Sequence, residues 1–173
     1  MMTSMAYAQE KKYGINVGFQ GNLPERIFNN QLGSFDGQRG GGGFSIGPSY
    51  QYSEKIQLSA MVGFNVIAED ATTDDIGTFN ILSVVPTISH QVLDTKVTPF
   101  YSVGIGSFSV LNSETRFAPG LSTNVGVSFF DSSTLSLEYT KILSQIQVNE
   151  NVINGFDNWY YVGIKLLFHI KLK

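Results

Sequence analysis

Apolar and polar residues alternate one by one over most of this chain. At its start, Tyr13, Ile15, Val17 and Phe19 share one face, and glycine and amide residues occupy the positions between them. Alternation with a period of two residues predicts β-strands that have one apolar and one polar face. The pattern recurs and predicts eight strands, at about residues 13–20, 44–52, 56–66, 78–92, 101–106, 121–129, 135–140 and 160–172.

The alternation is less regular in two places. It is weaker in the strand predicted near residues 78–92, where Val85 falls among the polar positions. It also blurs at Lys141 and Ile142, which we interpret as a bulge near the end of the apolar band.

Short and long connections follow one another in strict alternation. Tight turns are expected at residues 53–55, 93–96 and 131–133, and longer connections near 21–42, 68–77, 112–116 and 149–158. Bacterial outer-membrane barrels have short periplasmic turns and longer extracellular loops. With an even number of strands, both termini lie at the end of the tight turns, which would be the periplasmic end.

Composition decides which face points outward. Only 14% of the residues are charged, and no run approaches the roughly 20 apolar residues of a spanning helix. The polar face is rich in Gly, Ser, Asn, Gln and Thr, which suits a crowded interior better than a surface in water. We therefore predict an all-β, eight-stranded antiparallel up-and-down transmembrane β-barrel with a packed polar interior. The alternative is a soluble lipocalin-like ligand-binding barrel, with Val17, Val62, Val125 and Ile164 pointing inward.

Several classes of site and partner are disfavoured by composition. The chain has no Cys, which excludes disulfides, Cys-ligated metal centres and a thiol nucleophile. Its net charge of −3 gives no basic footprint for nucleic acid. No cofactor is expected.

Repeated blocks carry a family resemblance. These are YGINVG from Tyr13, GPSYQYSEK from Gly47, YSVGIG from Tyr101 and YVGIK from Tyr161. They resemble the small outer-membrane β-barrel families of OmpA/OmpX and opacity-protein type, over residues 12–173. The resemblance implies integral insertion in the bacterial outer membrane, in contact with its lipid and lipopolysaccharide. Residues 1–11 are interpreted as a tail with a signal-peptide remnant, because Ala6-Tyr7-Ala8 resembles a cleavage site.

Glu138 and Lys165 are the clearest candidate site. Both fall on the polar face of strands that follow one another in the chain. Pairing of these strands predicts an interior ion pair, either a structural plug or a gate. Removing one partner would leave a buried charge, at a cost of about 3–5 kcal/mol.

The longer loops offer two weaker candidates. Glu69, Asp70, Asp74 and Asp75 place four acids near one another, as a cation site or a solvated acidic loop. The first loop carries apolar residues that are expected to bind a partner or to pack on the barrel rim: Ile27, Phe28, Leu32 and Phe35. The run Gly40 to Gly43 is expected to be a flexible hinge of that loop.

Catalysis has little support in the sequence. The two histidines, His90 and His169, fall near the tight-turn end on opposite predicted faces. No Ser/His/acid constellation can be assembled around them. The expected function is therefore non-enzymatic, a structural or partner-binding role through the extracellular loops, with other envelope proteins as partners. The alternative within the membrane is a narrow porin-like channel.

Overall fold

The computed structural model describes residues 12–23, 38–69, 78–93, 95–111, 117–130, 132–143, 147–148, 151–152 and 160–172. Within these ranges the chain forms ten strands: β1 (Tyr13–Leu23), β2 (Gln38–Gln51), β3 (Ile56–Glu69), β4 (Thr78–Gln91), β5 (Val97–Val110), β6 (Ala118–Phe129), β7 (Ser133–Ile142), β8 (Gln147–Val148), β9 (Asn151–Val152) and β10 (Tyr160–Lys171). No helix among the described residues is long and apolar enough to cross a membrane.

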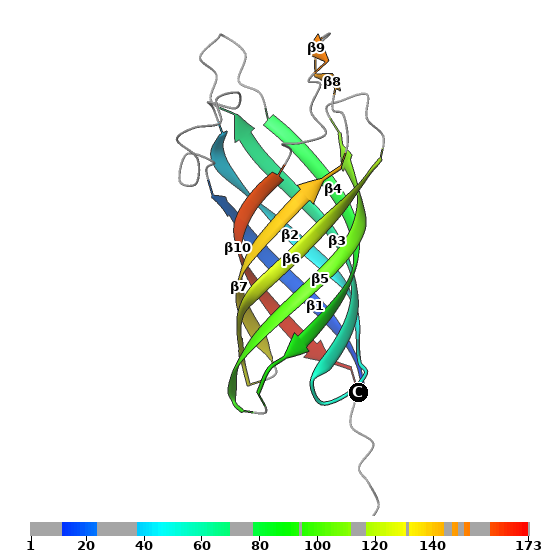
Figure 1. Ribbon diagram of the computed structural model, residues 1–173, viewed down its shortest axis with the longest axis vertical. Helices are drawn as coiled ribbons and strands as arrows, with labels where there is room; N and C mark the ends of the chain where they lie inside the picture. Colours follow the sequence, from blue (N-terminus) through cyan, green and yellow to red (C-terminus); the bar gives the residue numbers. More distant parts are fainter. Residues whose placement is uncertain are drawn as a thin grey trace, which may run out of the picture.

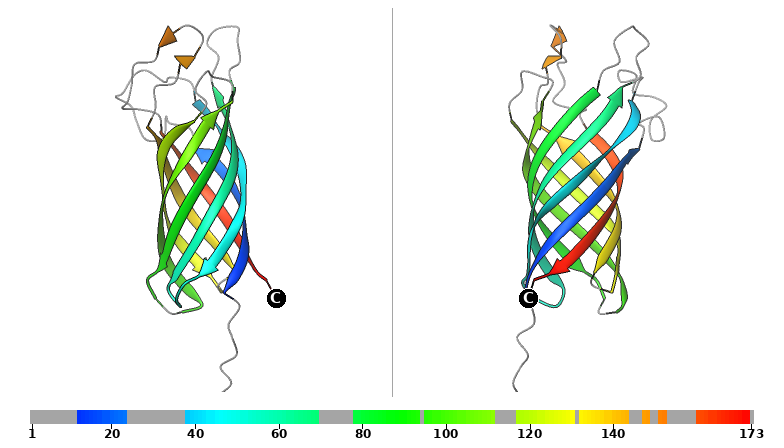
Figure 2. Two further views of the ribbon diagram at one scale, coloured as in Figure 1. Left: turned by 90° about the vertical axis from the view of Figure 1, so that its right-hand side faces the viewer. Right: turned by 180° about the vertical axis from the view of Figure 1, so that it is seen from behind.

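Eight of these strands close into one antiparallel barrel. Its order is β1-β10-β7-β6-β5-β4-β3-β2, and the short β8 and β9 pair only with each other. The barrel closes where β10 pairs with β1, for example at Phe168 opposite Val17. The strands are strongly tilted against the long axis (Figure 1), and the wall is continuous when seen from the other sides (Figure 2). The predicted eight-stranded up-and-down barrel is confirmed.

Apolar side chains point out of this barrel, and small polar ones point in. Val62, Val125 and Ile164 are 45%, 61% and 46% exposed, whereas Asn16 and Thr140 are 1% and 0% exposed. The period of two makes each strand present one face to the lumen and the other to the outside. A lipocalin-like barrel needs the opposite orientation, so that alternative is wrong.

The tight turns and the C-terminal end of β10 lie at one end of the barrel (Figure 1). In the first turn, the amide nitrogens of Tyr52 and Ser53 donate to the carbonyl oxygen of Ile56. In the third, Phe130 adopts a left-handed backbone with φ of 50°. Such a backbone is costly for an aromatic residue and is tolerated here because the turn must reverse the chain within few residues.

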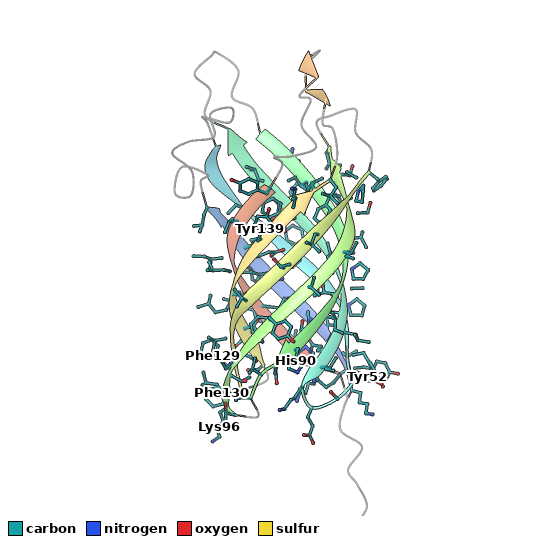
Figure 3. The ribbon with its side chains drawn as sticks, viewed as in Figure 1. Tyr52, His90, Lys96, Phe129, Phe130 and Tyr139 are labelled. Carbon is teal, nitrogen blue, oxygen red and sulfur yellow. The ribbon has the colours of Figure 1, made fainter. Side chains whose placement is uncertain are left out.

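Aromatic side chains mark both ends of the outer surface. Tyr52, Phe129 and Phe130 lie near the tight-turn end and Tyr139 near the opposite end (Figure 3). The rings of Tyr139 and Tyr160 have their centroids 5.7 Å apart. Aromatic belts flanking an apolar band are typical of barrels that cross a bilayer.

Two local predictions are wrong. Gly40 to Gly43 is not a hinge but part of β2, and Gly41 to Gly43 pair with β1 and β3 on either side. A Cβ on Gly41 would lie 2.0 Å from the carbonyl oxygen of Val66, so glycine is needed for the close approach of the strands. The bulge lies at Gln38 and Gly40, while the ladder is regular through Lys141 and Ile142.

The interior is polar, as predicted, but only part of it is packed. A cavity of about 910 Å³ occupies the lumen. Small inward residues explain this space, because Gly18, Ser45, Gly63 and Ser83 follow one another across β1 to β4. The predicted polar interior is confirmed, and the cavity adds a space that the sequence does not predict.

Candidate functional site

The lumen brings Glu138 and Lys165 together. Glu138 lies in β7 opposite Gly163 of β10, two residues from Lys165, so the two charged side chains are diagonal neighbours. Lys165 Nζ is 3.0 Å from Glu138 Oε2, and the side chains are 14% and 7% exposed. The two opposite charges compensate each other where both side chains are largely buried.

Hydroxyl groups complete the surroundings of the carboxylate. Ser122 Oγ of β6 donates a hydrogen bond of 2.9 Å to Glu138 Oε1, and Thr140 Oγ1 approaches the same oxygen at 3.3 Å. A carboxylate that accepts hydrogen bonds on one oxygen and an ammonium on the other is well stabilised when buried. Glu138 is therefore held by contacts to both of its carboxylate oxygens.

Glycines make the room that this pair needs. A Cβ on Gly163 would lie 2.8 Å from Gln20 Nε2, and one on Gly18 would lie 3.4 Å from Lys165 Cε. Side chains at these two positions would crowd the layer that holds the ion pair. The sequence thus reserves space in the lumen on β10 itself and on the neighbouring strand β1.

An apolar layer lies beyond the ion pair, toward the end with the longer connections. Tyr161 precedes Lys165 by four residues on β10, and Ile142 follows Glu138 by four on β7. They belong to a buried cluster of inward-facing side chains: Ile67, Ile81, Val85, Phe108, Ala118, Ile142 and Tyr161. Ile81, Phe108 and Ile142 are almost inaccessible to solvent. This layer closes the lumen at that end of the described barrel.

The cavity extends through the lumen from the tight-turn end to this apolar layer. Phe108, Tyr161 and the ion pair line its inner part, and exposed residues of the tight turns, such as Lys55 and Lys96, line its mouth. Between them its wall is made mainly of Ser, Thr, Asn and Gln side chains. The lumen is therefore a polar chamber open at the tight-turn end and closed at the other.

His169 lies in the wall of this chamber, on the lumenal face that its sequence position predicts. Its Nδ1 is 2.5 Å from Asn16 Oδ1 and 3.3 Å from Ser49 Oγ, and Gln57 Nε2 approaches the ring at 3.4 Å. Asn16 and Ser49 contact the same ring nitrogen, and Gln57 contacts both ring nitrogens. A ring shared by three polar side chains fits a structural hydrogen-bond network better than a catalytic dyad.

His90 has a different environment. It lies on the outer face near the tight-turn end (Figure 3), where its ring packs on Tyr101 with centroids 5.2 Å apart. The two histidines are thus separated by the barrel wall. No group of three or more His, Asp or Glu side chains among the described residues could hold a metal ion.

The structure describes only one residue of the two candidate sites in the longer loops. Glu69 ends β3, but Asp70, Asp74 and Asp75 lie outside the described residues. The same holds for the apolar residues of the first loop, Ile27, Phe28, Leu32 and Phe35. Both remain predictions from sequence.

Sequence reasoning missed the chamber and its apolar closure. The inward position of Ile81 follows from the alternation in its predicted strand, and those of Ile67 and Phe108 follow once their strands are extended to the loop end. The size of the chamber has no such signal, because it depends on which small residues meet across neighbouring strands.

Comparison with known proteins agrees with this architecture. No family model and no curated protein matches the sequence. Among solved structures, the outer membrane enzyme PagL superposes with a TM-score of 0.50 and 12% identity, covering 91% of this chain and 99% of PagL. The outer membrane protein OprG from Pseudomonas aeruginosa superposes with a TM-score of 0.52 and 8% identity, covering 92% of this chain and 93% of OprG. The chain has the fold of a small outer-membrane β-barrel.

The matched structures share the fold with this chain but little of its sequence. The N-terminal β-barrel domain of Pseudomonas aeruginosa OprF also matches, with a TM-score of 0.47 and 12% identity over 91% of this chain and 97% of that domain. One of the matched proteins, PagL, is an enzyme by its description. The likeness therefore establishes the fold, and the function must be argued from the residues of this chain.

Proposed function

We propose that this chain is an integral outer-membrane protein whose lumen does not conduct, and that it acts through surfaces outside the lumen. The observation that carries this proposal is the closure at one end: an ion-paired layer is followed by almost inaccessible apolar side chains. An ion crossing this layer would lose its hydration without gaining ligands, which is costly. The exposed apolar exterior supports insertion in lipid.

In this proposal, the role is structural or partner-binding, through extracellular loops at the end opposite the tight turns. The tight turns and termini then face the periplasm, as in other barrels with this ordering of connections. The protein is an accessory component of the envelope and no enzyme. The contacts of the His169 ring to Asn16, Ser49 and Gln57 support a structural role for this histidine.

The first experiment has two parts. Cell fractionation followed by gel electrophoresis of unheated and boiled samples tests for a closed barrel in the outer membrane. Planar-bilayer recording with the purified chain then tests for conductance. Membrane fractionation, a shift in mobility on boiling and silent bilayers are expected. A soluble chain, or steady conductance from the wild type, would contradict the proposal.

A narrow channel is the second candidate, and the chamber favours it. Its inner end reaches the Glu138–Lys165 pair, so these residues would form the gate. In this case Glu138→Gln and Lys165→Met should each raise the open probability severalfold. Equal silence of the wild type and both variants would dismiss the channel.

A further inference from the structure

The chamber in the lumen has the features of a ligand site, and this inference goes beyond the proposed function. Its volume of about 910 Å³ lies within the range of roughly 300–1,000 Å³ that is typical of pockets for small molecules. It is open at the tight-turn end and ends at Phe108 and Tyr161. A molecule that enters would therefore be held in a chamber closed at its far end.

Polar groups without partners point to the kind of molecule. Ser45 Oγ, Asn65 Oδ1 and Asn124 Oδ1 have no hydrogen-bond partner among the described residues, although all three residues line the chamber. Ser45 and Asn65 are only 8% and 5% exposed. A buried polar group without a partner is costly, and a hydroxyl group of a ligand in the chamber can supply the missing partner.

The charges of the chamber narrow the chemical class of the ligand further. Glu138 and Lys165 neutralise each other, so the inner wall offers no uncompensated charge for an anion or a cation among the described residues. The lysines of the mouth, Lys12, Lys55, Lys96 and Lys171, are exposed and screened by water and salt. A neutral ligand is therefore favoured.

The wall also offers apolar surface beside its amides and hydroxyls. Phe100 of β5 and Met61 of β3 line the chamber, as do the amide side chains of Gln57 and Asn124. Sugars present both hydroxyl groups and apolar C–H faces, and hydroxyl groups can donate and accept. We propose that the chamber binds a neutral polyhydroxylated molecule of mono- or disaccharide size.

The proposal can be tested with sucrose as the probe. The full chain, isotopically labelled and folded in a detergent without a sugar headgroup, is titrated while the side-chain amide resonances of Asn and Gln are recorded. Saturable shifts confined to lumenal residues such as Asn65 and Asn124 are expected. Absence of shifts up to high millimolar sucrose would overturn the proposal and leave a chamber filled with water only.

Two neighbouring residues of β3 supply a matched pair of variants. Ser59 lines the chamber, whereas Leu58 is exposed on the outer face. Ser59→Trp should fill the chamber and abolish the shifts, and Leu58→Trp should leave them unchanged. Equal shifts in both variants would mean that sucrose binds elsewhere and would overturn the proposal.

A milder variant guards against misfolding of Ser59→Trp. Asn124→Leu removes one unpartnered oxygen and should weaken sucrose binding roughly fivefold, the effect of one net hydrogen bond. Heat-dependent gel mobility shows that each variant is folded. If inorganic phosphate produced saturable shifts of the lumenal amides and sucrose did not, the ligand would be an anion and the proposal would be overturned. Conductance is recorded separately, so failure of this proposal and failure of the proposed function give different results.

Discussion

At the scale of residues, the lumenal ion pair shows how far position along a strand predicts contact. The alternation with a period of two residues places Glu138 and Lys165 on the inner face. The pairing of β7 with β10 makes them neighbours. The hydroxyl groups of Ser122 and Thr140 that hold the carboxylate were not predicted. Ser122 belongs to β6, and its approach depends on the register between β6 and β7.

The free energy of unfolding should fall most when only one partner of the ion pair is removed. Glu138→Gln leaves the Lys165 ammonium without its counter-charge in a largely buried layer. We expect the free energy of unfolding to fall by about 3–5 kcal/mol, measured by urea unfolding in lipid vesicles.

The double variant Glu138→Gln/Lys165→Met is the control, because it removes both charges. It should be more stable than Glu138→Gln alone. If the losses from the two single variants simply add up in the double variant, the two side chains do not interact energetically.

At the scale of elements, the irregular stretches of the sequence have a common cause. The alternation is weak near residues 78–92 and blurs at Ile142, and the structure places Ile81, Val85 and Ile142 on the inner face. Apolar residues on both faces hide the period of two. The loss of contrast thus marked the apolar closure of the lumen and not a bulge.

The glycines of β2 provide an element-scale prediction. Gly41→Ala places a methyl group 2.0 Å from the Val66 carbonyl oxygen, so β2 and β3 must move apart. We expect a loss of more than about 2 kcal/mol in unfolding free energy, from the strain of an overpacked contact.

Gly21→Ala is its matched control, since a Cβ at Gly21 has no neighbour within 4 Å. It should change the stability by less than about 0.5 kcal/mol, as is usual for an open position. Similar unfolding midpoints in urea for the two variants would show that the close approach of β2 and β3 carries no energetic weight.

At the scale of the whole molecule, the exterior determines the medium in which the barrel is stable. Val125, Leu137 and Ile164 form an outward-facing row across three adjacent strands, β6, β7 and β10. Such a row is suited to lipid, whereas in water it would form an exposed apolar patch. The solvent outside the barrel is thus part of what stabilises the fold.

The substitution Leu137→Arg tests whether the outer face of the barrel lies in lipid. A charge in the middle of a lipid-facing strand should lower the stability in vesicles by about 2–4 kcal/mol. Tyr13→Arg, at the tight-turn rim, should cost no more than about 1 kcal/mol. If Leu137→Arg is neutral in urea unfolding, this face does not lie in the bilayer core.

The apolar layer that closes the lumen is made by side chains from several strands, and substitutions in it should open the lumen. Phe108→Ala combined with Tyr161→Ala removes two large side chains where the chamber ends. We expect single-channel events in planar bilayers where the wild type is silent. Leu166→Ala, on the outer face, should remain silent; conductance in this control would attribute the events to a loosened barrel.

The sequence by itself determined the number of strands, the face that each presents and the ordering of tight and long connections. These features are local, because both the alternation of apolar and polar residues and the tight turns depend only on residues that are close together in the sequence. Only the tertiary structure decided that glycines and serines of four strands meet in an open chamber, and that apolar residues of six strands close it. Both depend on register and on closure of β10 against β1, where residues far apart in the chain become neighbours.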